Sequence, residues 1–95
     1  MNIDDFAGRE GEAFPAASEA HPQAVELSLT SVTTLGSPTT EDGRQPFSLI
    51  LHGPVEPMLP QGTHHFEHTA LGSFDMFIVP LGPDQAGMQY QAVFG

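Results

Sequence analysis

The last third of the chain, from Gly62 to Gly95, is the feature that most constrains the fold. It holds three apolar, strand-like runs at about residues 63–69, 73–81 and 88–94, with glycine-containing turns between them. Successive side chains of a β-strand point to opposite faces, so such runs bury one face of a sheet and leave the other in water. The pattern predicts an antiparallel β-meander.

Earlier segments add strands to this sheet. Residues 24–34 and 47–52 alternate apolar with polar side chains, which is typical of half-buried strands. The alternation breaks at Val32, which predicts a bulge or the end of that strand. Residues 12–18 are a weaker candidate, because Pro15 has no N–H to donate to a ladder and belongs at an edge or a bulge.

The remaining segments complete a small closed or curled sheet. Residues 3–7 are amphipathic and predict a short helical turn that covers one barrel end, while 36–46 and 82–87 have the composition of loops. The apolar run 76–79 predicts a strand covered on both faces. We therefore expect one all-β domain over residues 1–95, an antiparallel barrel or roll of five or six strands with a short N-terminal helical turn. Its edges would be the first strand, around Phe14, and the last strand, which ends at Phe94.

The charge balance limits the classes of molecule that the chain is expected to bind. Twelve acidic residues face only Arg9 and Arg44, there is no lysine, and the formal net charge is −10. Nucleic acid and anionic membranes are poor partners for such a chain, because both are bound through clustered Lys and Arg. A protein with a basic patch fits better. The N-terminus has no signal-peptide pattern and no run approaches a membrane span, so we expect a cytoplasmic protein.

Histidines and carboxylates suggest one alternative function, the binding of a metal ion. His64, His65 and His68 lie within five residues, but on a strand His64 and His68 stand about 13 Å apart while His65 points to the other face. The simpler expectation is that these histidines are partly exposed strand residues around a buried Phe66. A metal site would have to be assembled from the strand and its neighbours, from the set His52, His65, Glu67 and His68, with Asp75 as a further candidate across the sheet. The same histidines would also make the surface sensitive to pH.

Catalytic chemistry has no signature in the chain. Cysteine is absent, and no serine occupies a G-x-S-x-G context. Adjacent carboxylates such as Glu41 and Asp42 are more typical of turns, and only two permanent cations could clamp an anion. We assign no catalytic residue and no cofactor, and an enzyme is not expected.

The proline-rich segment 54–60 is the candidate interaction site. Its three prolines stiffen the backbone around Val55, Met58 and Leu59, and an ordered apolar loop binds at a lower entropic cost than a flexible one. Alternatively the loop caps the barrel mouth, with Met58 and Leu59 buried.

Several runs of the sequence resemble one family. They are PFSLILHGP at 46–54, LPQGT at 59–63, FIVPLGP at 77–83, GMQYQAVF at 87–94 and, near the start, Asp5-Phe6-Ala7. These runs are similar to DUF6916, a family of small bacterial domains of unknown function. Members often have an aromatic and a basic residue after the Gly-Thr, where this chain has His64 and His65. The resemblance implies a domain boundary, a bacterial origin and an accessory role in a phage-tail-like assembly, but no chemistry.

Together these observations predict a non-enzymatic structural or protein-interaction domain. Its partner would be another protein, self-association included, contacted through an edge strand or the proline-rich loop. The alternative is a β-barrel that binds a small molecule or a metal at a His/Glu site.

Overall fold

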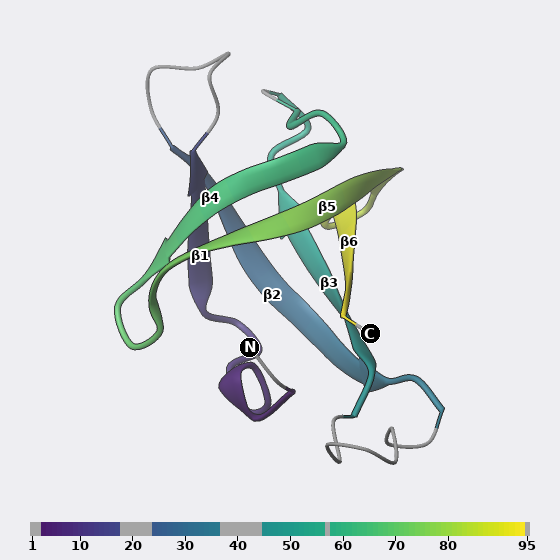
Figure 1. The fold of residues 1–95 in the computed structure, drawn as a ribbon. Helices are drawn as coiled ribbons and strands as arrows, with labels where there is room; N and C mark the ends of the chain where they lie inside the picture. The colour runs from purple at the N-terminus through teal and green to yellow at the C-terminus, as the bar shows by residue number, and fades with distance from the viewer. Residues whose placement is uncertain (1–2, 18–23, 37–44, 57, 95) are drawn as a thin grey trace.

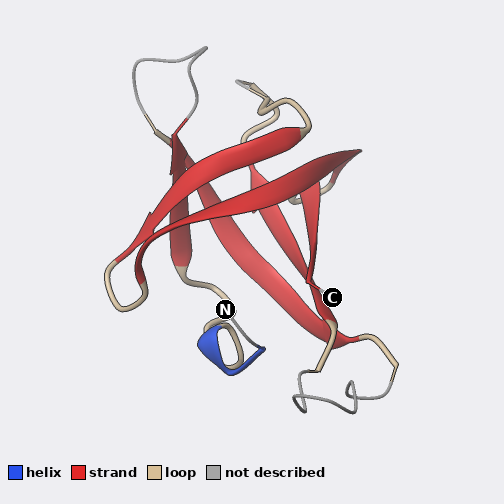
Figure 2. Ribbon diagram, in the orientation of Figure 1, coloured by secondary structure: helices blue, strands red, loops and turns tan. Residues whose placement is uncertain are grey.

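A computed structural model of the chain describes residues 3–17, 24–36, 45–56 and 58–94. Its elements in chain order are the 3-10 turn η1 (Ile3–Asp5) and the strands β1 (Ala13–Ala17), β2 (Val25–Thr34), β3 (Phe47–Gly53), β4 (Gly62–His68), β5 (Gly72–Asp84) and β6 (Gly87–Phe94). The strands close into an antiparallel barrel in the order β1-β2-β3-β6-β5-β4 (Figures 1 and 2). The all-β prediction is confirmed, with six strands rather than five.

Closure of the barrel depends on how the β4–β5 hairpin pairs with β1 on one side and with β6 on the other. The β4–β5 hairpin crosses over the other four strands (Figure 1). It joins β1 only at the pairs Ala16–Phe66 and Ala17–His65, and it joins β6 only from Val79 onward. Both predicted edges are therefore wrong, since β1 and β6 each have a strand on both sides. Pro15 is tolerated because it lies just outside the β1–β4 pairing.

Phe6, directly after η1, fills the end of the barrel. It is fully buried, and its ring centre lies 5.7–6.1 Å from those of Phe14, Phe47, Phe74 and Phe94. Aromatic rings at this spacing gain contact energy in addition to the area they bury. The predicted N-terminal lid is confirmed, and it is an apolar plug rather than a surface cover.

Three local predictions need correction. The β2 bulge lies between Leu29 and Ser31 rather than at Val32. β5 continues to Asp84, so most of the predicted 82–87 loop is strand and a tight turn. Phe77 is 52% exposed although its neighbours in the apolar run are buried, so β5 is covered on one face only. Most of the predicted 36–46 loop lies outside the described residues.

No helix among the described residues has the length and apolar character to cross a membrane.

Candidate functional site

The predicted His/Glu metal set does not converge. Along β4 the side chains alternate, so that His68 points inward while His65 and Glu67 point outward, and His52 belongs to β3. In the part of the chain that the structure describes, no group of three or more His, Cys, Asp or Glu side chains could hold a metal ion. Phe66 is buried as expected, but His64 and His68 are buried too, contrary to the expectation of partly exposed rings.

His65 has two carboxylates close to its ring, but their arrangement does not make a metal site. Asp75, the predicted cross-strand neighbour, approaches His65 Nδ1 at 2.9 Å, while Glu67 approaches Nε2 at 3.6 Å. The two carboxylates therefore flank opposite sides of the ring and share no central point. The hydrogen bond to Asp75 raises the pKa of His65 above 6.5. Loss of hydration opposes this increase and is the next largest effect, while the charges of Asp75 and Glu67 add to it.

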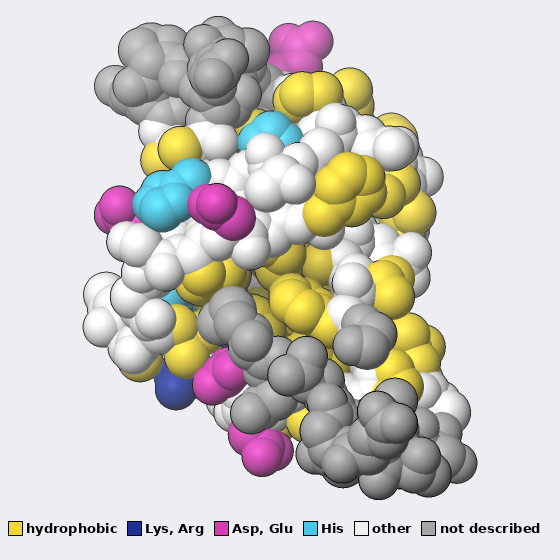
Figure 3. Space-filling view, viewed as in Figure 1, with side chains coloured by type: hydrophobic (Ala, Val, Ile, Leu, Met, Phe, Trp, Pro, Cys, Tyr) yellow, Lys and Arg dark blue, Asp and Glu magenta, His cyan; other side chains and the backbone are white. Residues whose placement is uncertain are grey.

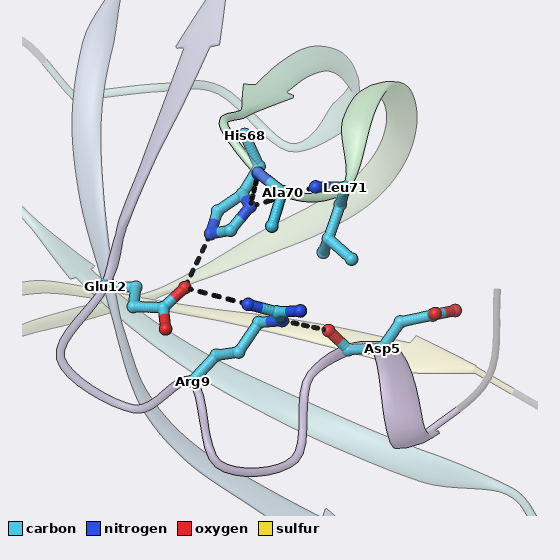
Figure 4. Close-up of polar contacts among 6 residues, drawn as sticks. All are labelled: Asp5, Arg9, Glu12, His68, Ala70 and Leu71. Carbon is cyan, nitrogen blue, oxygen red and sulfur yellow. Dashed lines mark hydrogen bonds and ion pairs between the residues drawn. The ribbon is translucent and has the colours of Figure 1, made fainter.

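His68 is the centre of a polar network at the plugged end of the barrel (Figure 4). Its Nε2 lies 2.7 Å from Glu12 Oε1, and its Nδ1 accepts the backbone N–H groups of Ala70 at 3.0 Å and Leu71 at 3.2 Å. The ring also stacks on Phe14, with 4.5 Å between centres. Because Nδ1 accepts twice, the ring proton lies on Nε2 and is donated to Glu12.

Glu12 extends this network to the N-terminus. Arg9 Nη1 approaches Glu12 Oε1 at 3.5 Å, and Arg9 Nε donates to the carbonyl oxygen of Asp5 at 2.9 Å (Figure 4). The contacts tie η1, the start of β1 and the β4–β5 turn together. Both nitrogens of His68 are used, so the cluster is an internal latch that leaves no ring atom for a ligand.

His52 forms a second, different arrangement on the outer wall of the barrel. Its Nε2 lies 2.8 Å from Asp84 Oδ2 and its Nδ1 lies 2.5 Å from Thr30 Oγ1. The hydrogen bond from His52 lowers the pKa of Asp84 below 3.8, helped by the backbone N–H of Ala86. Asp84 and Thr30 had no role in the sequence prediction, because they lie 32 and 22 residues from His52 and no spacing rule connects them.

A shallow pocket of about 660 Å³ opens beside this row. It is lined by Gly11, Glu26, Ser28, Leu29, Thr30, His52, Gly53, Pro54, Ala86 and Gly87. The turn before β6 can approach β3 only because residue 87 is glycine. Its φ is 126°, and a Cβ there would collide with the carbonyl oxygen of Gly53. This approach brings Asp84 within reach of His52.

The three predicted interaction residues of the proline-rich loop differ in exposure. Val55 and Met58 expose about half of their surface, whereas Leu59 is fully buried and its N–H donates to Tyr90 Oη at 2.9 Å. Leu59 is therefore wrong as a surface contact, because its side chain belongs to the core. The capping alternative holds for Leu59 and fails for Met58.

Large apolar side chains also lie on the outer wall, where the sequence prediction did not place them. Phe77, Leu81 and Val93 are 52%, 46% and 60% exposed. Figure 3 shows hydrophobic side chains over the right-hand ends of β4 and β5, close to the loop that joins β3 to β4. The available signal was the unbroken apolar run in β5, but that pattern predicts a strand covered on both faces.

A sequence-family profile described as "Domain of unknown function (DUF6916)" matches residues 1–94. Neither the curated proteins nor the solved structures include a match to the chain.

Proposed function

Because the chain belongs to the DUF6916 family, whose description names no activity, we propose from the barrel's own surface that the domain binds another protein. The contact is the β5–β6 surface, formed by Phe77, Leu81 and Val93, together with Val55 and Met58 of the neighbouring loop. The observation that carries the proposal is the exposure of Phe77 and Val93, each more than half accessible on an outward strand position.

The apolar side chains of the β5–β6 surface are not part of the hydrophobic core. Met76 and Ile78, on either side of Phe77, are buried, so the strand has a normal inner face and Phe77 points away from it. The register pairs Val79 with Gln91, which places Phe77 and Val93 on the same side of that pair. Isolated exposed apolar residues are common, but several large ones on one wall are typical of an interaction surface.

Charge indicates the chemistry of the partner. Two residues before Phe77 on the same outer face lies Asp75, and Glu67 faces outward on the adjacent strand. With a net charge of −10, two copies of the chain repel each other, whereas a partner with an apolar centre and a rim of Lys and Arg is attracted. We therefore commit to a basic-rimmed protein partner rather than to self-association.

The test compares matched variants in the native host. Tagged wild type, Phe77→Ser, Val93→Ser and the control Thr33→Ser, which changes an exposed residue of β2, are purified in parallel with their bound proteins. We expect one stoichiometric partner that is retained by Thr33→Ser and lost from both β5–β6 variants. Binding of that purified partner should weaken as salt rises. Elemental analysis of the same samples tests the metal-binding alternative.

Three outcomes would overturn the proposal. Partners that are equally abundant on all four proteins would not use this surface. A concentration-dependent dimer disrupted by Phe77→Ser would replace the basic partner with a second copy. Stoichiometric metal with no protein partner would favour the His/Glu alternative. An accessory role in a phage-tail-like assembly, which the family resemblance implies, would show as tail proteins among the specific partners.

A further inference from the structure

Thr30, His52 and Asp84 form a continuous hydrogen-bonded row on the outer wall of the barrel. Thr30 lies in the β2 bulge, His52 near the end of β3 and Asp84 at the end of β5. The distances are 2.5 Å from Thr30 Oγ1 to His52 Nδ1 and 2.8 Å from His52 Nε2 to Asp84 Oδ2. A hydroxyl, an imidazole and a carboxylate in this order are the parts of an activated nucleophile.

The direction of the hydrogen bonds follows from Asp84. An ionised carboxylate only accepts hydrogen bonds, so His52 Nε2 carries a proton and donates it to Asp84. In the neutral imidazole Nδ1 is then bare, and it accepts the hydroxyl proton of Thr30. The other acceptor near Thr30 Oγ1 is the carbonyl oxygen of Ser28, at 3.5 Å, which is a much weaker contact.

The surroundings hold the base and leave the hydroxyl accessible. The side chain of His52 is only 11% exposed and is fixed at both nitrogens, whereas Thr30 is exposed at the pocket of about 660 Å³. Gly53 and Gly87 line the same pocket without side chains, so a small acyl group can approach Thr30 Oγ1 from solvent.

We propose that Thr30 is an activated hydroxyl that takes up the acyl group of a reactive ester, with His52 as its general base and Asp84 as the positioning residue. Thr30 Oγ1 attacks the ester carbonyl carbon while its proton passes to His52 Nδ1. The bond between the carbonyl carbon and the leaving oxygen then breaks, and the leaving oxygen takes up the proton from His52. The products are an ester on Thr30 and a free alcohol.

The composition of the chain makes this testable with one simple probe, p-nitrophenyl acetate. The protein has no lysine and no cysteine, so the N-terminal amine is the main competing nucleophile and serves as an internal reference. Digestion at glutamates separates Thr30 from the N-terminus, since Glu26 and Glu41 bracket it. Mass spectrometry then follows acetylation of Thr30 over time, and nitrophenolate release gives the rate.

Five variants assign the roles. Thr30→Val should abolish the adduct in its peptide, whereas Thr30→Ser should retain it. His52→Gln should slow acetylation by about 10²- to 10⁴-fold, the usual contribution of a positioned base. Asp84→Asn should also slow it, and Asp84→Glu should restore part of the rate if the carboxylate orients the imidazole. Thr33→Val, on the same strand, is the control and should react like wild type. Circular dichroism checks that each variant is folded.

A purely structural hydrogen bond predicts a different result. The inference is overturned if Thr30 is acetylated no faster than Thr33, if the label appears on the N-terminus or on His52 alone, or if folded His52→Gln reacts at the wild-type rate. The inference is established if residue 30 is acetylated in a way that depends on His52, both in the wild type and in Thr30→Ser.

Discussion

At the plugged end of the barrel His68 donates to Glu12 across 2.7 Å, and on the outer wall His52 donates to Asp84 across 2.8 Å. The two histidine–carboxylate distances are nearly equal, but the second ring nitrogen has different partners in the two pairs. His68 Nδ1 accepts the two backbone N–H groups of Ala70 and Leu71. His52 Nδ1 faces the Thr30 hydroxyl beside an open pocket.

The difference shows that the group opposite the carboxylate decides what such a histidine can do. Backbone N–H groups leave His68 nothing to deprotonate, and the stacking on Phe14 fixes its ring, so the pair contributes to stability. A hydroxyl gives His52 a proton to remove, so the same pair becomes a base. The comparison therefore predicts that changes at the plugged end alter folding and that changes on the outer wall alter chemistry or binding.

The largest difference in stability between the two regions should come from substituting one phenylalanine in each. Phe6→Ala removes a fully buried ring that contacts four others, and we expect it to lower the free energy of unfolding by about 3–5 kcal/mol. Phe77→Ala removes a ring that is 52% exposed on the outer wall, and we expect a change within about 0.5 kcal/mol. Urea unfolding of both variants measures the difference. Equal losses would show that the β5–β6 surface is part of the core.

A smaller contrast separates the two histidines. His68→Ala leaves the N–H groups of Ala70 and Leu71 without their acceptor, and we expect a loss of about 2–4 kcal/mol. His52→Ala releases Thr30 and Asp84 on the solvent side of the wall, where water can replace the ring, and we expect a loss of about 1 kcal/mol.

The same urea titrations check this pair, with acetylation of Thr30 as the second readout. His68→Ala should retain acetylation under conditions where it is folded, and His52→Ala should lose it. If His52→Ala proved as destabilising as His68→Ala while acetylation was unchanged, the distinction between latch and base would fail.

The strands could be predicted because alternation is a local property. Residues 24–34 and 47–52 gave β2 and β3 nearly to the residue. The strand pairs that close the barrel could not be predicted, because no short turn joins β3 to β6 or β1 to β4. The two predicted edge strands were wrong for this reason.

The sites were harder to predict than the strands. Alternation placed His65 and His68 on opposite faces, which correctly weakened a metal site within β4. It could not show that Asp84 meets His52, since that contact depends on the extension of β5 and on the close approach of Gly87 to β3. Nor could the apolar run around Phe77 show which of its faces is covered.

The smallest expected effect belongs to His65, a third histidine with carboxylate partners and 46% side-chain exposure. Its pKa is raised above 6.5, chiefly by the hydrogen bond to Asp75. A raised pKa in the folded state stabilises the protein fully below pH 6.5, and this stabilisation is lost as pH rises through the folded value. Asp84 behaves oppositely. Its pKa is lowered below 3.8, so its contribution is present above that pH and is lost as pH falls through the lower folded value.

Asp75→Asn isolates the His65 effect. Because it also removes one negative charge from a chain of net charge −10, the control is Glu10→Gln, which changes the same charge at another exposed position. We expect Asp75→Asn to be less stable than Glu10→Gln below pH 6.5, and the gap between them to close at higher pH and in about 1 M salt. An NMR titration should place the midpoint of His65 above 6.5 in the wild type and nearer to it in Asp75→Asn. A gap that is constant with pH would mean that the exposed pair of His65 and Asp75 contributes nothing through its charge.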